Sequence, residues 1–195
     1  MNIWRFSLLS LLAIVLAAAP NSSAAPTEPG TYRGWGGEID CVVINRTFRA
    51  DDYQDIVVEP LDITKVAVPE RKGESPAEVF AVLPSLKPAF LVSLQKNLRR
   101  RTPMPGATGK ALIIRVRVTK ADPGTRSPKF GDVKANAAKL EVSGEVIDPA
   151  TSLILVQFTQ ERWSGLITIG KTSGQLLRDA AGLIGEDVGH LISAF

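Results

Sequence analysis

Three segments in the second half of the chain alternate between apolar and polar side chains, which is typical of β-strands with one buried face. These segments are residues 111–119, 139–147 and 152–163. In the first of them, aliphatic side chains alternate with Arg115, Arg117 and Thr119. Because successive side chains of a strand point to opposite faces, such segments predict a sheet with one face against a core.

Charge and turn residues indicate how these strands pair. If the first two segments lie side by side, opposite charges meet across their polar faces and stabilise the sheet. These charges are Arg115 and Arg117 on one strand and Glu141 and Glu145 on the other. Residues 148–151 (DPAT) favour a type I turn, so the third segment is expected to fold back on the second as a hairpin.

One long helix is predicted in the middle of the chain. A capping pattern from Ser75 to Glu78 favours a short helix, and a second helix begins near Ser85 and is closed by Arg99, Arg100 and Arg101. Apolar side chains that recur about every four residues form its predicted core stripe. These are Leu86, Phe90, Leu91, Leu94 and Leu98.

A second long helix is predicted from about Ser173 to Ala194, after a capping box formed by Thr172 and Gln175. Its predicted apolar stripe consists of Leu177, Ala180, Ile184, Val188 and Leu191. Glycines inside a helix are costly unless they allow close packing. Because this helix contains Gly182, Gly185 and Gly189, we expect it to lie tightly against the sheet.

The order of these elements predicts the fold class. Residues 39–46 and 53–59 are two further candidate strands, and residues 25–38 are rich in Gly and Pro, as in a flexible arm. We therefore expect one α+β domain over residues 39–195, with a mainly antiparallel sheet and two principal helices packed on one face.

Residues 1–24 have the layout of a secretory signal peptide. Arg5 precedes a short apolar run, and the small residues Ser22 and Ala24 place the cleavage after Ala24. An uncleaved membrane anchor is the alternative. No later run approaches about 18 apolar residues, so we expect a periplasmic or secreted protein without a transmembrane span after cleavage.

Recognisable motifs for catalysis, metal binding or cofactor binding are missing from the sequence. The single Cys41 begins an apolar stretch, which favours a buried thiol, and the single His190 lies near the end of the last helix. One Cys and one His supply too few ligands for a zinc site. We predict no catalytic residue, no metal and no cofactor.

A hydrolase that uses carboxylates is the alternative from another functional class, because paired acids converge in space rather than in sequence. The candidate acids are Asp51, Asp52, Asp55, Glu59 and Asp62. Two of them would need to approach within hydrogen-bonding reach in a pocket. A purely structural assembly subunit is a third possibility, and the oligomeric state stays open.

The charges are distributed unevenly along the chain. Between Lys87 and Lys139 there are thirteen basic and two acidic residues, a net charge of +11, whereas between Glu28 and Asp62 the net charge is −5. Two interpretations remain open: a basic surface for an anionic envelope component, or two segments that neutralise each other in the folded protein.

The first interpretation predicts a basic binding face. Its candidate residues are Arg99, Arg100, Arg101, Lys129 and Lys134. The predicted function is that of an exported, soluble, non-catalytic envelope protein that binds a protein partner or an anionic surface component. Nucleic acid is not expected as a partner, because the protein is exported and the basic stretch lacks interleaved aromatic residues.

Several short stretches also carry a resemblance to a known group of proteins. They are residues 53–60 (YQDIVVEP), the leucine-periodic helix that ends in arginines, the strand at 111–118, and residues 144–151 (GEVIDPAT) with the strand and helix that follow. From Tyr53 to Phe195 the chain resembles small bacterial envelope proteins, often lipoproteins, of domain-of-unknown-function families. These families are similar in architecture to the amino-terminal domain of TolB and to CsgG-like proteins. The resemblance implies a periplasmic, non-enzymatic role, although this chain has no Cys at the cleavage site.

Overall fold

The computed structural model describes residues 25–71, 75–98, 111–124, 137–165 and 171–195. In chain order, the strands are β1 (Gly30–Trp35), β2 (Ile39–Ile44), β3 (Asp55–Val58), β4 (Ala111–Asp122), β5 (Ala138–Asp148) and β6 (Leu153–Ser164). The helices are α1 (Pro76–Val82), α2 (Leu86–Leu98) and α3 (Ser173–Ser193), with short 3-10 turns η1 (Ala50–Asp52) and η2 (Leu83–Ser85).

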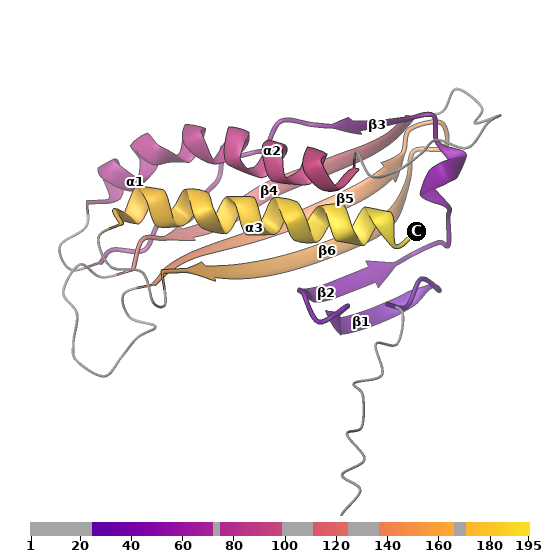
Figure 1. The fold of residues 1–195 in the computed structure, drawn as a ribbon, viewed down its shortest axis with the longest axis horizontal. Coiled ribbons are helices and arrows are strands. Elements are labelled where there is room, and N and C mark those ends of the chain that lie inside the picture. Colours follow the sequence, from indigo (N-terminus) through magenta and orange to yellow (C-terminus); the bar gives the residue numbers. More distant parts are fainter. Residues whose placement is uncertain (1–24, 72–74, 99–110, 125–136, 166–170) are drawn as a thin grey trace, which may run out of the picture.

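The six strands form one sheet in the order β1-β2-β6-β5-β4-β3 (Figure 1). Neighbouring strands are antiparallel except β3 and β4, which run parallel. The predicted hairpin of β5 and β6 is present, and the Asp148 side chain accepts a hydrogen bond from the backbone N–H of Ala150 in its turn. The predicted α+β class with a mainly antiparallel sheet is therefore confirmed.

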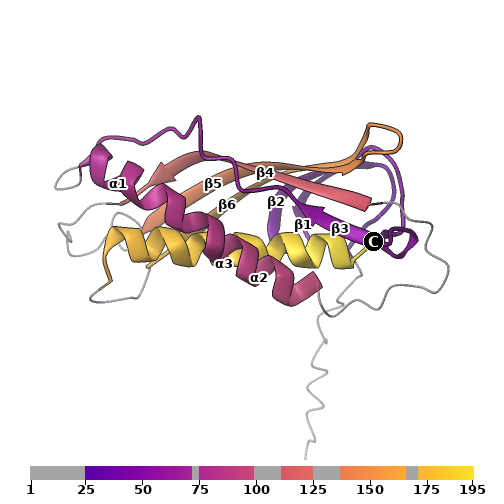
Figure 2. The ribbon, with the colours of Figure 1, turned by 90° about the horizontal axis from the view of Figure 1, so that it is seen from above.

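Both long helices lie on the same side of the sheet (Figure 2). Helix α3 packs on β5 and β6, and α2 packs against α3. The aliphatic side chains that alternate along β4, from Leu112 to Val118, are buried beneath the helices, as the period of two predicts. The core thus lies between one face of the sheet and the two helices.

The glycines of α3 face the other helix rather than the sheet, which corrects the expectation from the sequence. A Cβ on Gly185 would lie 2.3 Å from the backbone oxygen of Phe90 in α2, and one on Gly189 would lie 2.6 Å from Asn97 Cβ. The close packing was predicted correctly, but its partner is α2. The predicted stripe of α2 is also narrower than expected, because Leu91 is exposed.

Part of the segment expected as a flexible arm forms the edge strand β1. Two aromatic side chains of β1 hold the residues before it: Trp35 Nε1 donates to the Pro26 carbonyl at 2.8 Å, and the Tyr32 hydroxyl donates to the Glu28 carbonyl at 3.0 Å. The Gly and Pro residues of this stretch suggested a loop. They did not indicate the strand β1, because β1 forms by antiparallel pairing with β2, a later segment of the chain.

The helical stretch Pro76–Leu98, which comprises α1, η2 and α2, is long and apolar enough to cross a membrane by length and composition alone. The sequence analysis did not identify this stretch as a candidate membrane span, because Lys87 and two prolines interrupt its run of apolar residues. Leu86, Phe90 and Leu94 are buried in the common core with α3 and the sheet, so one side of the stretch belongs to the folded domain.

Candidate functional site

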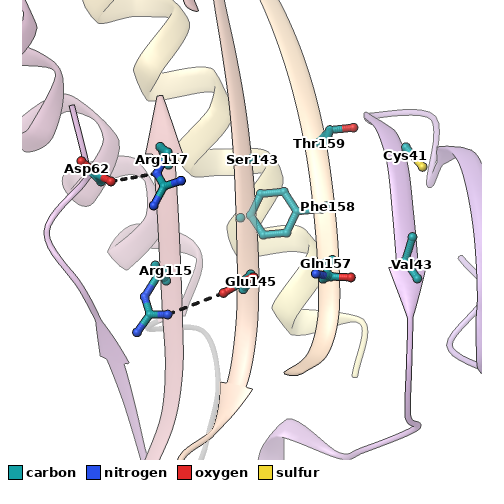
Figure 3. Close-up of a pocket in the computed structure, with 11 residues that line it drawn as sticks. Cys41, Val43, Asp62, Arg115, Arg117, Ser143, Glu145, Gln157, Phe158 and Thr159 are labelled. Carbon is teal, nitrogen blue, oxygen red and sulfur yellow. Dashed lines mark hydrogen bonds and ion pairs between the residues drawn. The ribbon is translucent and has the colours of Figure 1, made fainter. Parts of the chain in front are cut away.

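The face of the sheet opposite the helices carries a candidate surface site. A hollow of about 470 Å³ opens on this face over β2, β4, β5 and β6 (Figure 3). Its lining includes charged, polar and small apolar side chains: Asp62, Arg115, Arg117, Glu145, Ser143, Gln157, Thr159, Cys41, Val43 and Phe158. We refer to this concavity as the sheet hollow.

Arg115 is held in the hollow by two carboxylates. Its Nε and Nη2 donate to the Glu59 carboxylate at 2.7 and 3.1 Å, and its Nη1 lies 3.6 Å from Glu145. The hydrogen bonds from Arg115 lower the pKa of Glu59 below its usual range. Arg115 is therefore an ion-paired group at the margin of the hollow, and its charge is neutralised locally.

Arg117 is bound less completely. Its Nε donates to Asp62 at 2.8 Å, and the remaining acceptor of Asp62 is used by the backbone N–H and hydroxyl of Thr64, at 2.9 and 2.7 Å. These hydrogen bonds from Thr64 and Arg117 lower the pKa of Asp62 well below its usual range. Among the described residues, Nη1 and Nη2 of Arg117 donate no hydrogen bond, and the guanidinium lies over β4 on the face of the sheet that carries the hollow (Figure 3).

The centre of the hollow is uncharged. Ser143, Gln157 and Thr159 supply hydroxyl and amide groups, and Cys41 and Val43 form the wall on β2 (Figure 3). Cys41 is partly exposed, which corrects the expectation of a buried thiol, because its position in β2 faces away from the helices.

Beyond the hollow, the same face of β5 and β6 carries a cluster of ion pairs. Lys139 Nζ lies 2.7 Å from Glu141 and 2.9 Å from Glu161, and it sits 5.1 Å from the ring centroid of Trp163. Lys120 on β4 adds a contact of 3.5 Å to Glu141. Charges of both signs thus lie side by side at this end of the face.

The strand register explains which of the predicted charge pairs form. Arg115 lies opposite Glu145, as predicted. Because Arg115 lies opposite Glu145, the regular register places Arg117 opposite Ser143. A bulge between Val118 and Lys120 then brings Lys120 opposite Glu141. Arg117 finds its partner Asp62 outside the antiparallel strands, in the segment that runs along β4.

The five predicted residues of the basic binding face, Arg99, Arg100, Arg101, Lys129 and Lys134, lie outside the described residues. The described residues do show how some of the unevenly distributed charges pair in the folded protein. Arg115 binds Glu59 and Arg117 binds Asp62, so the basic and acidic segments are joined by two ion pairs. These pairs support the interpretation that the two segments neutralise each other.

The acids proposed for a carboxylate hydrolase are distributed over two places. Glu59 and Asp62 each bind an arginine, and Asp51 and Asp55 line a separate hollow of about 440 Å³ beside η1, β3 and α2. Hydrolysis needs one acid with a raised pKa, whereas the pKa of Glu59 and that of Asp62 are lowered.

Within the described ranges, no group of three His, Cys, Asp or Glu could hold a metal ion. The single His190 contacts Glu38, with 2.9 Å between Nδ1 and Oε2.

A buried polar cluster on the helix side of the sheet was missed by the sequence reasoning. Arg162 donates to both carboxylate oxygens of Asp187 at 2.5 and 2.6 Å, and Gln160 Nε2 donates to the same carboxylate at 2.9 Å. Burial raises the pKa of Asp187, and the hydrogen bonds from Arg162 and Gln160 oppose this. The sequence did contain a signal for this cluster. Residues 160 and 162 lie two and four positions after Phe158, so they point to the same face of the strand as the core residues Val156 and Phe158.

Comparisons with known proteins give only distant likenesses. No protein-family model matches the sequence, and no curated protein matches it. Among solved structures, a PelC dodecamer from Paraburkholderia phytofirmans has 10% identity and a TM-score of 0.38, covering 74% of this chain and 96% of that chain. A Xanthomonas campestris protein of the family DUF330 has 12% identity and a TM-score of 0.41, covering 72% of this chain and 84% of that chain.

At these identities and TM-scores, the likeness decides neither the function nor the assembly of this chain.

Proposed function

We propose that this protein is exported to the cell envelope and binds a protein partner through the open face of its sheet, with no catalytic step of its own. The observation that carries the proposal is the sheet hollow, which combines interleaved charges with an uncharged polar centre. Export is supported by the signal-peptide layout of residues 1–24.

The chemistry of the sheet hollow favours a protein over a purely anionic ligand. Arg115 and Arg117 are each paired with carboxylates, so the hollow offers little net positive charge to an anion. It offers instead free guanidinium donors on Arg117, hydroxyl and amide groups, and the apolar wall of Val43. Arg is enriched at protein interfaces and among the residues that contribute most to binding, so Arg117 is the residue of the hollow that best fits a protein partner.

The basic face predicted from the sequence, centred on Arg99, Arg100 and Arg101 with Lys129 and Lys134, stays a separate proposal. It would bind an anionic envelope component rather than the protein partner, because positive charge without paired acids attracts anions. Charge reversal at these arginines is the test that separates the two surfaces: it should leave binding at the sheet hollow unchanged.

Cys41 allows a direct test of the sheet hollow, because it is the single cysteine of the chain and lines the hollow. A photoreactive maleimide attached to Cys41 should crosslink the partner in envelope extracts of the producing organism. In the matched control, Cys41→Ser is combined with Gln95→Cys, which moves the same probe to the outside of α2. Crosslinking of the same product from both positions, or of none from Cys41, contradicts the proposal.

Binding of the identified partner then tests the role of Arg117. Arg117→Ala should raise the dissociation constant roughly thirtyfold, because removing a central interface side chain costs about 2 kcal/mol of binding free energy. Lys171→Ala is the control, since Lys171 pairs with Asp179 on the helix side of the molecule. Equal affinities of the wild type and Arg117→Ala would contradict a binding site at the sheet hollow.

A further inference from the structure

Helix α2 and the short helix α1 before it are apolar on both sides, although only one side is buried. The inner side contributes Val79, Leu83, Leu86, Phe90 and Leu94 to the core. A helix that is apolar all round is typical of a protein interior or of a membrane environment. Only 28% of the apolar window in Pro76–Leu98 is buried, so the outer side needs a separate explanation.

The outer side forms one continuous apolar stripe. Phe80 is 51% exposed, Val92 is 67% exposed and Leu91 is 36% exposed. Ala77, Ala81, Pro84 and Pro88 are also exposed. These positions lie three or four residues apart, so they share one side of the helical stretch. We call these seven residues the outer stripe.

Within the helical stretch itself, the charges beyond the first turn are positive, whereas Asp51 and Asp55 of η1 and β3 line a hollow beside Leu91 at one end of the stripe. No Asp or Glu occurs from Val79 to Leu98, and the two charged residues of this stretch, Lys87 and Lys96, are both exposed. Exposed Lys beside an apolar helix face is the composition of helices that lie in the interface of an anionic membrane.

We propose that the outer stripe docks this protein on an anionic lipid surface, with Lys87 and Lys96 at the headgroups and Phe80, Leu91 and Val92 among the acyl chains. A second copy of the chain fits the stripe less well. An interface formed by the same stripe on two copies would bring the lysines of both copies together, and the nearby acids Asp51 and Asp55 line a hollow beside Leu91 rather than belonging to the stripe. An anionic headgroup layer supplies the missing negative charge.

The docking does not use the sheet hollow, which lies on the opposite face of the sheet from the helices. The protein would therefore lie with its helices toward the membrane and with the sheet hollow turned away from it. This arrangement leaves the sheet hollow open to a protein partner while the domain is bound to lipid.

Flotation of the purified full chain with lipid vesicles tests the proposal. Vesicles of phosphatidylglycerol and phosphatidylethanolamine should bind the protein, vesicles of phosphatidylcholine should bind it weakly, and added salt should reduce the binding. Val92→Glu combined with Phe80→Ser should lower the vesicle affinity at least tenfold, because two apolar side chains no longer enter the bilayer. Lys87→Gln and Lys96→Gln should each lower the affinity for anionic vesicles about fivefold.

Val57→Glu is the matched control, since Val57 is 46% exposed on β3, in the sheet. All variants carry the same residues 1–24, so any lipid binding by that segment is equal among them. Circular dichroism and urea unfolding identify a variant that is not folded, and single substitutions Phe80→Ser and Val92→Ser then replace the double variant.

Equal vesicle binding of the wild type and the stripe variants overturns the proposal, as does the absence of binding to anionic vesicles. Light scattering gives the remaining outcome, which also overturns it: if the wild type is a dimer and Val92→Glu is a monomer, the stripe is an interface between copies. A failure of the lipid test leaves the sheet-hollow proposal untouched, because that proposal is tested by crosslinking from Cys41.

Discussion

Gly185 of α3 lies directly against the backbone carbonyl of Phe90 in α2. A Cβ at position 185 would come within 2.3 Å of that oxygen and 3.1 Å of the backbone nitrogen of Leu94. Backbone atoms of a packed helix cannot rotate away as a flexible side chain does, so any side chain at 185 must push the two helices apart. This contact fixes the distance between α2 and α3.

Gly185→Ala should therefore lower the free energy of unfolding by about 1 to 3 kcal/mol, despite the better helix propensity of Ala. Gly182→Ala is the matched control on the same helix. Its Cβ would meet only Ser93 Oγ, at 3.3 Å, with backbone no nearer than 4.0 Å. It should be neutral or stabilising by up to about 1 kcal/mol in urea unfolding. Equal losses in the two variants would contradict the close approach.

The buried pair Arg162 and Asp187 should show the behaviour of a charge that has lost its partner. Asp187→Ala should cost about 3 to 5 kcal/mol, because the guanidinium of Arg162 stays partly buried without its carboxylate. The double variant Asp187→Leu with Arg162→Met should recover most of this loss, because both charges are then removed. Thermal and urea unfolding of Asp187→Leu, of Arg162→Met and of the double variant measure the coupling, and purely additive losses would argue against it.

Acid should destabilise the folded chain through its paired surface carboxylates. The pKa of Glu59, of Asp62 and of Glu141 is lowered in the folded state, so each contributes stability above its unfolded pKa, and that stability is lost as the pH falls. The unfolding midpoint in urea should decrease below about pH 5.

Thr64→Val isolates the contribution of Asp62 to this acid sensitivity. The variant removes the hydroxyl that donates to Asp62 at 2.7 Å, so the pKa of Asp62 rises toward its usual value of 3.8. The decrease in the urea midpoint between about pH 6 and pH 3 should be smaller in Thr64→Val than in the wild type. An identical decrease in both proteins would exclude this role for Thr64.

Phe195 and Phe48 join the end of α3 to the loop before η1. Their rings stack with centroids 4.5 Å apart and an interplanar angle of 11°, and the Phe195 carbonyl accepts from the Ala50 N–H at 3.0 Å. A double-mutant cycle of Phe48→Ala and Phe195→Ala should give a coupling of about 0.5 to 1.5 kcal/mol. A coupling near zero would show that the rings contribute only separately.

The regular elements followed from the sequence because their causes are local. The side chains from Leu112 to Val118 alternate with a period of two, and this pattern fixes the buried face of β4 whatever strand lies beside it. The capping box of Thr172 and Gln175 likewise marks the start of α3, and both of its hydrogen bonds are formed. The hairpin turn at Asp148 is local in the same sense.

The sheet hollow and the polar cluster depend on residues that are distant in the sequence. Arg117 and Asp62 meet because the segment after β3 runs along β4, and Gln160 and Asp187 meet because α3 crosses β6. The bulge after Val118 places Lys120, rather than Thr119, opposite Glu141. The spacing along β6 indicates only that Gln160 points to the core side; it does not indicate the partner in any of these contacts.

The sequence by itself determined the α+β class, the buried faces of the strands and helices, and the close packing of α3. These follow from the periodicity of apolar residues and from the low helix propensity of glycine, and both act within one element. Only the tertiary structure decided that Gly185 packs on Phe90, that Cys41 opens into a hollow, and that Arg115 and Arg117 are neutralised. These properties arise between elements, where the chain path brings together groups that the local pattern cannot pair.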